Sequence, residues 1–167
     1  MIGGAFDQVE GARFFPSSPP YIPLANRSDV LVFETAPLDE DVEVVGSLEV
    51  LLFISSNCTD TDFTAKLVDV YPPSEDWPRG FAMNLHEGVL RARFRNESWA
   101  SPQLMEPGQV YPISINTFPC ANFFKKGHRI RLDISSSNFP HFDLNPNTGE
   151  PPGRSTRFQT ARNRVYV

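Results

Sequence analysis

Residues 135–149 read SSSNFPHFDLNPNTG, the densest collection of potentially reactive side chains in the sequence. Ser137, His141 and Asp143 are the residue types of a hydrolytic triad, in which an acid orients a histidine that takes the proton of a serine. An α/β-hydrolase places its nucleophile on a strained G-x-S-x-G turn, and that pentapeptide occurs nowhere in the chain. Side chains this close in an extended segment also point to alternate faces. We therefore expect turn residues that bond the local backbone, and no catalytic residue here.

The same stretch resembles part of a calcium-binding loop. Asp143, Asn145 and Asn147 fall at the first, third and fifth places of an EF-hand pattern. That pattern needs glycine at the sixth place and glutamate at the twelfth, where this sequence has Thr148 and Arg154. One carboxylate with two neutral amides is a weak ligand set, so we expect no calcium site.

Other candidate metal ligands are also few. Asp60 and Asp62 in CTDTDF form a second acidic pair, which is more typical of a turn that precedes a strand. The three histidines are scattered, and Cys58 and Cys120 lack C-x-x-C spacing. We expect neither a metal nor a cofactor, and the sequence leaves open whether the two cysteines pair.

The segment KKGHRIR, residues 125–131, is rich in positive charge and could bind an anion. Alternation instead predicts that Arg129 and Arg131 face solvent from a strand whose other face is core. His86 and His128 lie near turn glycines, and we expect both to be solvated.

Length and composition limit the class of protein. A chain of 167 residues with 40% hydrophobic content suits one domain with a substantial core. Its formal charge of -5 argues against nucleic acid or an anionic membrane surface as a partner. No apolar run reaches the roughly 20 residues of a membrane helix, and no signal peptide is recognisable. We expect a cytoplasmic protein, although the cysteines do not decide the compartment.

The elements that must position these residues are strands. Sixteen prolines and ten glycines leave few windows for a helix, whereas residues 129–135 alternate strictly between apolar and polar. Residues 88–95 and 109–116 alternate in the same way, and residues 46–55, apolar on both faces from Val50, predict a central strand covered on both sides. A change of phase in residues 63–71 is typical of a bulge. With turn signals between them, these strands predict an all-β fold, an antiparallel β-sandwich of the jelly-roll, galactose-binding-like type.

Aromatic residues leave a binding function open. Trp77 and Trp99 lie in polar or proline-rich segments and are the tryptophans most suited to exposure. Together with Phe81, Phe123 and Phe124 they could form a sugar-stacking platform. A carbohydrate-binding module is therefore the alternative interpretation.

Several longer segments resemble a known family when taken in chain order. These are DVLVFETAPLDEDVEVVGSLEVLLFISSNCTDTDFTAKLVDVYP, then FAMNLHEGVLRARFR, then FFKKGHRIRLDISSSNFPHFDLNPNTG. The sequence is similar to the C-terminal domain of the cocaine esterase and X-Pro dipeptidyl-peptidase (CocE/NonD) hydrolases over roughly residues 29–149. Its most specific pieces are DTDFTAKLVDV, KKGHRIRLDISSSNFP and NPNTG.

The resemblance implies a serine hydrolase acting on acyl esters or peptides, built from an α/β-hydrolase domain, a helical cap and a C-terminal jelly roll. It implies that residues 29–167 are that accessory β-sandwich, with residues 1–28 as a lead-in segment packed on it in a single domain. The expected partner is the catalytic domain of the same parent chain, which the sandwich buttresses and whose substrate it helps to enclose. Phe6, after the Gly-Gly pair, is the candidate for the rim of the substrate pocket. A homo-oligomer remains open.

Overall fold

The computed structural model describes residues 8–10, 19–96, 99–117, 119–151 and 153–166, and these residues form strands and short 3-10 turns. Within these ranges no helix is long and apolar enough to cross a membrane. The strands are β1 (Leu31–Glu34), β2 (Val42–Gly46), β3 (Glu49–Ser55), β4 (Asp62–Tyr71), β5 (Phe81–Arg91), β6 (Tyr111–Asn116), β7 (Cys120–Phe124), β8 (Arg129–Ser135) and β9 (Arg164–Tyr166). The 3-10 turns are η1 (Leu24–Asn26) and η2 (Ala92–Phe94).

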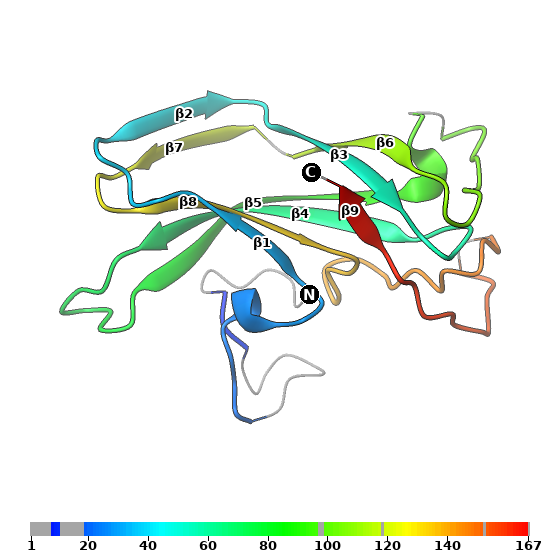
Figure 1. Ribbon diagram of the computed structural model, residues 1–167, viewed down its shortest axis with the longest axis horizontal. Helices are drawn as coiled ribbons and strands as arrows, with labels where there is room; N and C mark the ends of the chain where they lie inside the picture. The colour runs from blue at the N-terminus through cyan, green and yellow to red at the C-terminus, as the bar shows by residue number, and fades with distance from the viewer. Residues whose placement is uncertain (1–7, 11–18, 97–98, 118, 152, 167) are drawn as a thin grey trace.

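The strands make two layers, which Figure 1 shows one above the other. The first layer is a four-stranded sheet in the order β1-β8-β4-β5. The second consists of the sheet β6-β3-β9 and the two-stranded ribbon β2-β7. The ribbon continues this layer, since β2 leads into β3 and β6 leads into β7. All pairings are antiparallel. The structure therefore confirms an all-β antiparallel sandwich.

The core lies between the layers and follows from the period-two alternation of the strands. On β6, Ile113 and Ile115 are buried while their neighbours are more exposed, and on β8 Ile134 is buried. Burial of each such side chain contributes about 1.5–3 kcal/mol. The predicted strands at 129–135 and 109–116 are confirmed as β8 and β6. The buried residues of this cluster are Leu52, Ile54, Phe63, Ala65, Ala92, Met105, Ile113, Ile115 and Ile134.

The covering of β3 differs from the sequence prediction. This strand is central in its sheet, between β6 and β9, as predicted. Leu52 and Ile54 face the core, but Leu51 and Phe53 point away from it and are exposed. The prediction that both faces are covered is wrong for the described chain, because the first layer packs on only one side of β3.

The segment predicted as a strand over residues 88–95 also differs. β5 begins at Phe81 and ends at Arg91, where η2 takes over. The alternation puts Arg93 on the face opposite Leu90 and Ala92, and its side chain is nevertheless buried because it pairs with the buried Asp60. The predicted bulge is confirmed as a register shift between Leu67 and Val68, and the extra residue lies on β5.

The segment before β1 lies against the outer face of the first sheet. The backbone N–H of Gln8 donates to the carbonyl of Ala82 at 2.9 Å, and that of Leu24 donates to the carbonyl of Gln8 at 2.8 Å. Leu24 and Val30 are buried in a small apolar cluster with Val32 of β1. The described residues of the lead-in segment, 8–10 and 19–28, thus cover part of that sheet.

Candidate functional site

The outer face of the first sheet carries charged side chains that are buried. Lys66 and Asp133 are 0% exposed, and Arg131 is 5% exposed. The prediction that Arg131 lies on a solvated face is therefore wrong. Alternation correctly puts it on the side of the sheet away from the core, but that side is itself covered.

Lys66 is the centre of this buried network. Its Nζ donates to Oε1 of Gln8 at 3.3 Å and lies 3.8 Å from Oε2 of Glu87. Burial lowers the pKa of Lys66, against the opposing effect of Glu87 and Asp133, and burial raises the pKa of Asp133. Arg131 donates to Asp133 at 3.1 Å. The network therefore connects the lead-in segment to three strands of the sheet.

His128 is also buried, contrary to its expected exposure. Its Nδ1 lies 2.9 Å from Oδ1 of Asp69, and its ring packs on Tyr71 with a centroid separation of 4.2 Å. His86, on β5 opposite Leu67, is half-buried. Neither histidine is fully solvated, because strands of the first sheet pack around both.

The candidate triad is not assembled as a triad. The Nδ1 atom of His141 pairs with Glu87 on β5, rather than with Asp143. The hydroxyl of Ser137 accepts a hydrogen bond from the backbone N–H of Phe139 at 3.3 Å. This local bond is what the turn interpretation predicts.

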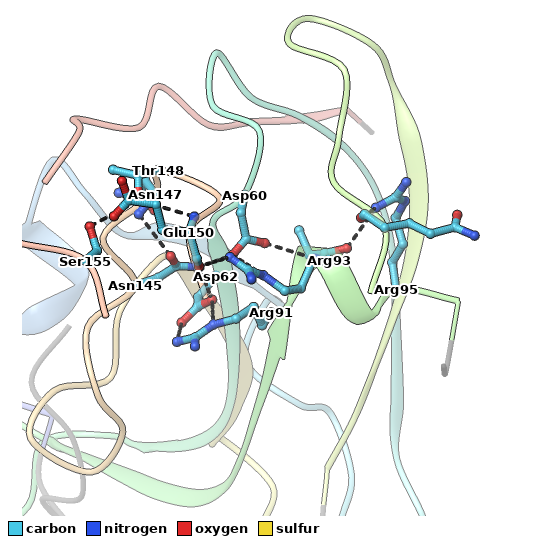
Figure 2. A network of polar contacts seen from close by, with 12 residues as sticks. Asp60, Asp62, Arg91, Arg93, Arg95, Asn145, Asn147, Thr148, Glu150 and Ser155 are labelled. Atoms are coloured by element: carbon cyan, nitrogen blue, oxygen red, sulfur yellow. Dashed lines mark hydrogen bonds and ion pairs between the residues drawn. The ribbon is translucent and has the colours of Figure 1, made fainter. Parts of the chain in front are cut away.

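The second polar network joins the candidate calcium ligands to the acidic pair, as Figure 2 shows. The side-chain Nδ2 of Asn145 donates to Oδ2 of Asp60 at 2.9 Å and to Oδ1 of Asp62 at 2.7 Å. Asp60 lies just before β4, as the turn interpretation predicts, and it is fully buried. We call Asp60, Asp62, Asn145, Arg91 and Arg93 the clamp, because they hold the loop after β8 against the start of β4.

Two arginines supply the positive charge that a metal would otherwise bring. Arg93 Nε donates to Asp60 at 2.8 Å, and Arg91 donates to Asp62 at 2.9 and 3.0 Å, a bidentate contact. Asn145 turns a donor toward the carboxylates, whereas a metal would need its oxygen. In the part of the chain described, no group of three or more His, Cys, Asp or Glu side chains could hold a metal ion.

The two tryptophans do not form a shared platform. Trp77 is 49% and Trp99 is 75% exposed. Trp77 lies in the loop between β4 and β5, and Trp99 lies in the segment after η2. Figure 1 shows these two segments at opposite ends of the sandwich. Each ring packs on a phenylalanine at a tilt, Trp77 on Phe81 and Trp99 on Phe94. This arrangement does not favour the carbohydrate-binding alternative.

The two cysteines are free and buried. Burial raises the pKa of both thiols, Cys58 and Cys120, so the thiolate form is disfavoured. Phe6, the candidate for the pocket rim, lies outside the described residues. The polar clusters described above are internally paired, and their chemistry is that of a scaffold.

Comparison with known proteins gives this scaffold a family. A family model described as the X-Pro dipeptidyl-peptidase C-terminal non-catalytic domain matches residues 5–167. The chain belongs to this family. It is 43% identical over 146 residues to a cocaine esterase of a Rhodococcus species, covering 86% of this chain and 24% of that protein. It thus spans about a quarter of the length of that relative.

Solved structures agree with this membership. An alpha-amino acid ester hydrolase is 32% identical, with a TM-score of 0.79 over 86% of this chain and 24% of that one. An aminopeptidase from a marine sediment Thaumarchaeota archaeon is 33% identical, with a TM-score of 0.77 over the same shares. The chain is thus a non-catalytic C-terminal domain of a hydrolase of the CocE and X-Pro dipeptidyl-peptidase type.

Two of the sequence pieces that carry the family resemblance meet in the fold. The pieces DTDF and NPNTG, far apart in the chain, join through Asn145 and the two aspartates. The contact itself was not foreseen, nor was the role of Lys66. The apolar residues on either side of it, Ala65 and Leu67, are the one signal that could have indicated a buried charge.

Proposed function

We propose that this domain docks on an α/β-hydrolase catalytic domain of the same parent chain, buttresses it and helps to enclose its acyl-ester or peptide substrate. The relatives described above include an esterase, an ester hydrolase and an aminopeptidase, and this chain corresponds to about a quarter of the length of each. The choice between ester and peptide belongs to residues of the catalytic domain.

The observation that carries the proposal is the attachment of the lead-in segment. In a C-terminal domain the catalytic domain precedes this segment. The connection between the two domains would therefore meet the sandwich at the outer face of the first sheet. There Gln8 is bonded through its backbone to β5 and through its side chain to Lys66. Because a buried network fixes Gln8 to the sheet, the lead-in segment can hold the sandwich in a fixed orientation relative to the catalytic domain. Phe6, two residues before Gln8, remains our candidate for the substrate rim.

Exposed aromatic residues accompany this attachment. Phe142 packs edge-on against His141, which is bonded to Glu87 on the same face of the sheet. Tyr21 belongs to the lead-in segment itself. Both side chains are about 40% exposed, as expected of residues that a second domain covers.

Separate expression of the catalytic portion and this chain tests the proposal. The two should bind in calorimetry, and turnover of a p-nitrophenyl ester should come only from the catalytic portion and rise when this chain is added. Phe142→Asp should weaken binding at least tenfold, whereas Val45→Lys, at a residue that is 70% exposed on the other layer, should leave it unchanged. Turnover by this chain alone, abolished by a serine-directed inhibitor, would overturn the proposal, as would the absence of binding.

A further inference from the structure

The second layer has a hollow where β3 ends, next to the loop that precedes β6. Its volume is about 400 Å³, which falls within the range of small-molecule sites. Figure 1 shows this end of β3 beside the start of β9, and Ser55 of β3 pairs there with Arg164 of β9. The polar side chains and the glycine that line the hollow are Ser55, Ser56, Asn57, Gly108, Arg162 and Arg164.

The hollow is positively charged in a chain whose formal charge is -5. Arg162 and Arg164 are exposed and two residues apart, so alternation puts both on the same side of the chain, about 7 Å apart. Asn163 turns to the other side, where its Nδ2 donates to the hydroxyls of Thr61 and Ser136. None of the described residues that line the hollow carries a carboxylate. Because like charges at this spacing repel each other, an anion between the two arginines would be stabilised.

Hydroxyl groups add hydrogen-bond donors to these two charges. The hydroxyls of Ser55 and Tyr166 lie 2.9 Å apart and share one hydrogen bond, which uses one of their two hydrogens. The bond to Ser55 lowers the pKa of Tyr166, and so does Arg164, whose side chain bonds to the same hydroxyl. The hydroxyl of Ser56 accepts from the backbone N–H of Cys58 at 3.1 Å and keeps its own hydrogen for donation. A bound anion would therefore meet hydroxyl donors as well as guanidinium groups.

The walls of the hollow are fixed by hydrogen bonds within the chain. Oδ1 of Asn57 accepts from the backbone N–H of Arg162 at 2.6 Å, and its Nδ2 donates to the carbonyl of Thr160 at 3.3 Å. In the loop before β6 the backbone N–H of Gly108 donates to the carbonyl of Ser56 at 2.7 Å. A site that is formed in advance loses little conformational freedom when it binds a ligand.

Charge and shape indicate which class of anion fits. Guanidinium groups present planar pairs of donors that match the oxygens of carboxylates and phosphates. A carboxylate brings one charge and two oxygens, whereas a phosphate monoester brings about two charges and three oxygens at pH 7. Two arginines with additional hydroxyl donors match the phosphate more fully. Phe53 lies two positions before Ser55 on the same face of β3 and is 58% exposed, so it offers a surface for an apolar group attached to the phosphate.

We propose that this hollow binds a small phosphate monoester, with the phosphate between Arg162 and Arg164 and the organic group toward Phe53. The hydroxyls of Ser55 and Ser56 would donate to the remaining phosphate oxygens. The site belongs to the second layer and requires no catalytic domain. The docking proposed above concerns the first layer, so either proposal can fail without the other.

Calorimetric titration of the 167-residue chain at low salt tests the proposal with phenyl phosphate, inorganic phosphate and benzoate. Phenyl phosphate should bind at one site, and benzoate, with its single charge, should bind at least tenfold more weakly. Inorganic phosphate should bind more weakly than phenyl phosphate, because it cannot contact Phe53. Arg162→Gln and Arg164→Gln should each weaken phenyl phosphate binding at least tenfold, because each removes charge-assisted hydrogen bonds. Arg79→Gln removes the same charge from an exposed residue between β4 and β5, and it should bind like the unchanged chain.

Four results would contradict the proposal. The chain could show no binding at 10 mM phenyl phosphate, benzoate could bind as tightly, inorganic phosphate could bind more tightly, or Arg79→Gln could weaken binding as much as Arg164→Gln. Circular dichroism of each variant should match that of the unchanged chain, since the substituted side chains are exposed. If Arg164→Gln lost its strand signal, Arg162→Gln, which lies before β9, would decide the outcome.

Discussion

Replacement of Arg93 by leucine should cost more stability than any other single change in the clamp. The carboxylate of Asp60 is fully buried and accepts hydrogen bonds from the backbone N–H of Arg93 at 3.0 Å and from its Nε at 2.8 Å. It also accepts one from Asn145 at 2.9 Å. Arg93→Leu keeps the backbone and amide bonds but removes the countercharge. A buried charge left without its partner costs about 3–5 kcal/mol.

Arg91→Leu is the matched control. Arg91 makes a contact of similar geometry with Asp62, but its side chain is 23% exposed, against 7% for Arg93. Water can therefore replace part of the lost interaction, and the expected cost is about 1–2 kcal/mol, between the values for surface and buried pairs. The difference between the two variants isolates the effect of burial.

Urea unfolding followed by circular dichroism measures both variants. For a domain of this size the Arg93→Leu loss corresponds to about 6–20 °C in the midpoint of thermal unfolding. The double variant Asp60→Asn, Arg93→Leu should be more stable than the sum of its single effects predicts, because the unpaired charge is gone. Two results would refute the reasoning from burial. Either Arg93→Leu would lower the free energy of unfolding no more than Arg91→Leu, or the loss in the double variant would equal the sum of the two single losses.

Two further predictions concern a titrating group and a tight turn. Burial raises the pKa of Glu87, but Asn138, His141 and the charge of Lys66 lower it by more, so its net pKa is below 4.5. Its contribution to stability is then present above pH 4.5 and lost as pH falls through the lowered pKa. The difference in melting temperature between the unchanged chain and Glu87→Gln should therefore shrink steadily as the pH falls below 4.5. A difference that stayed the same at every pH would contradict this. Gly149 has φ +76° and a Cβ there would lie 2.7 Å from a neighbouring hydroxyl, so Gly149→Ala should cost about 2–4 kcal/mol in urea unfolding. Gly153→Ala, with φ +73° but open space, should cost only about 1–2 kcal/mol, and equal losses would show that crowding is unimportant.

Alternation in the sequence predicted the strands well because it records which side of each strand meets the core. Residues 129–135 and 111–116 have one apolar face that packs between the layers, and both form strands. Alternation does not record what covers the opposite face. Arg131 was expected in solvent because the lead-in segment, distant in sequence, gives no local signal of its packing.

The clamp was beyond prediction for a similar reason. A strand through Arg93 satisfied the local pattern, but a buried carboxylate from another segment draws its guanidinium inward, and a 3-10 turn follows. Each half of the clamp appeared in the sequence as a candidate metal ligand set. Only the fold shows that the two sets bind each other, with arginine as the cation. The family resemblance, by contrast, could be recognised because motif order and spacing are properties of the sequence itself.

The clamp also determines how the domain would respond to mechanical load. β9 is three residues long and, among the described residues, its strand pairing is limited to Phe53–Ser55, whereas the chain before it is held at Asn145 by two carboxylates. A force applied at the C-terminal end would peel β9 first, would then break the bonds of Asn163 and Arg162, and would reach the clamp before it unravelled the chain back to β8. The clamp would therefore act as a mechanical stop, which separates a short, easily detached strand from the sheet that carries the lead-in segment.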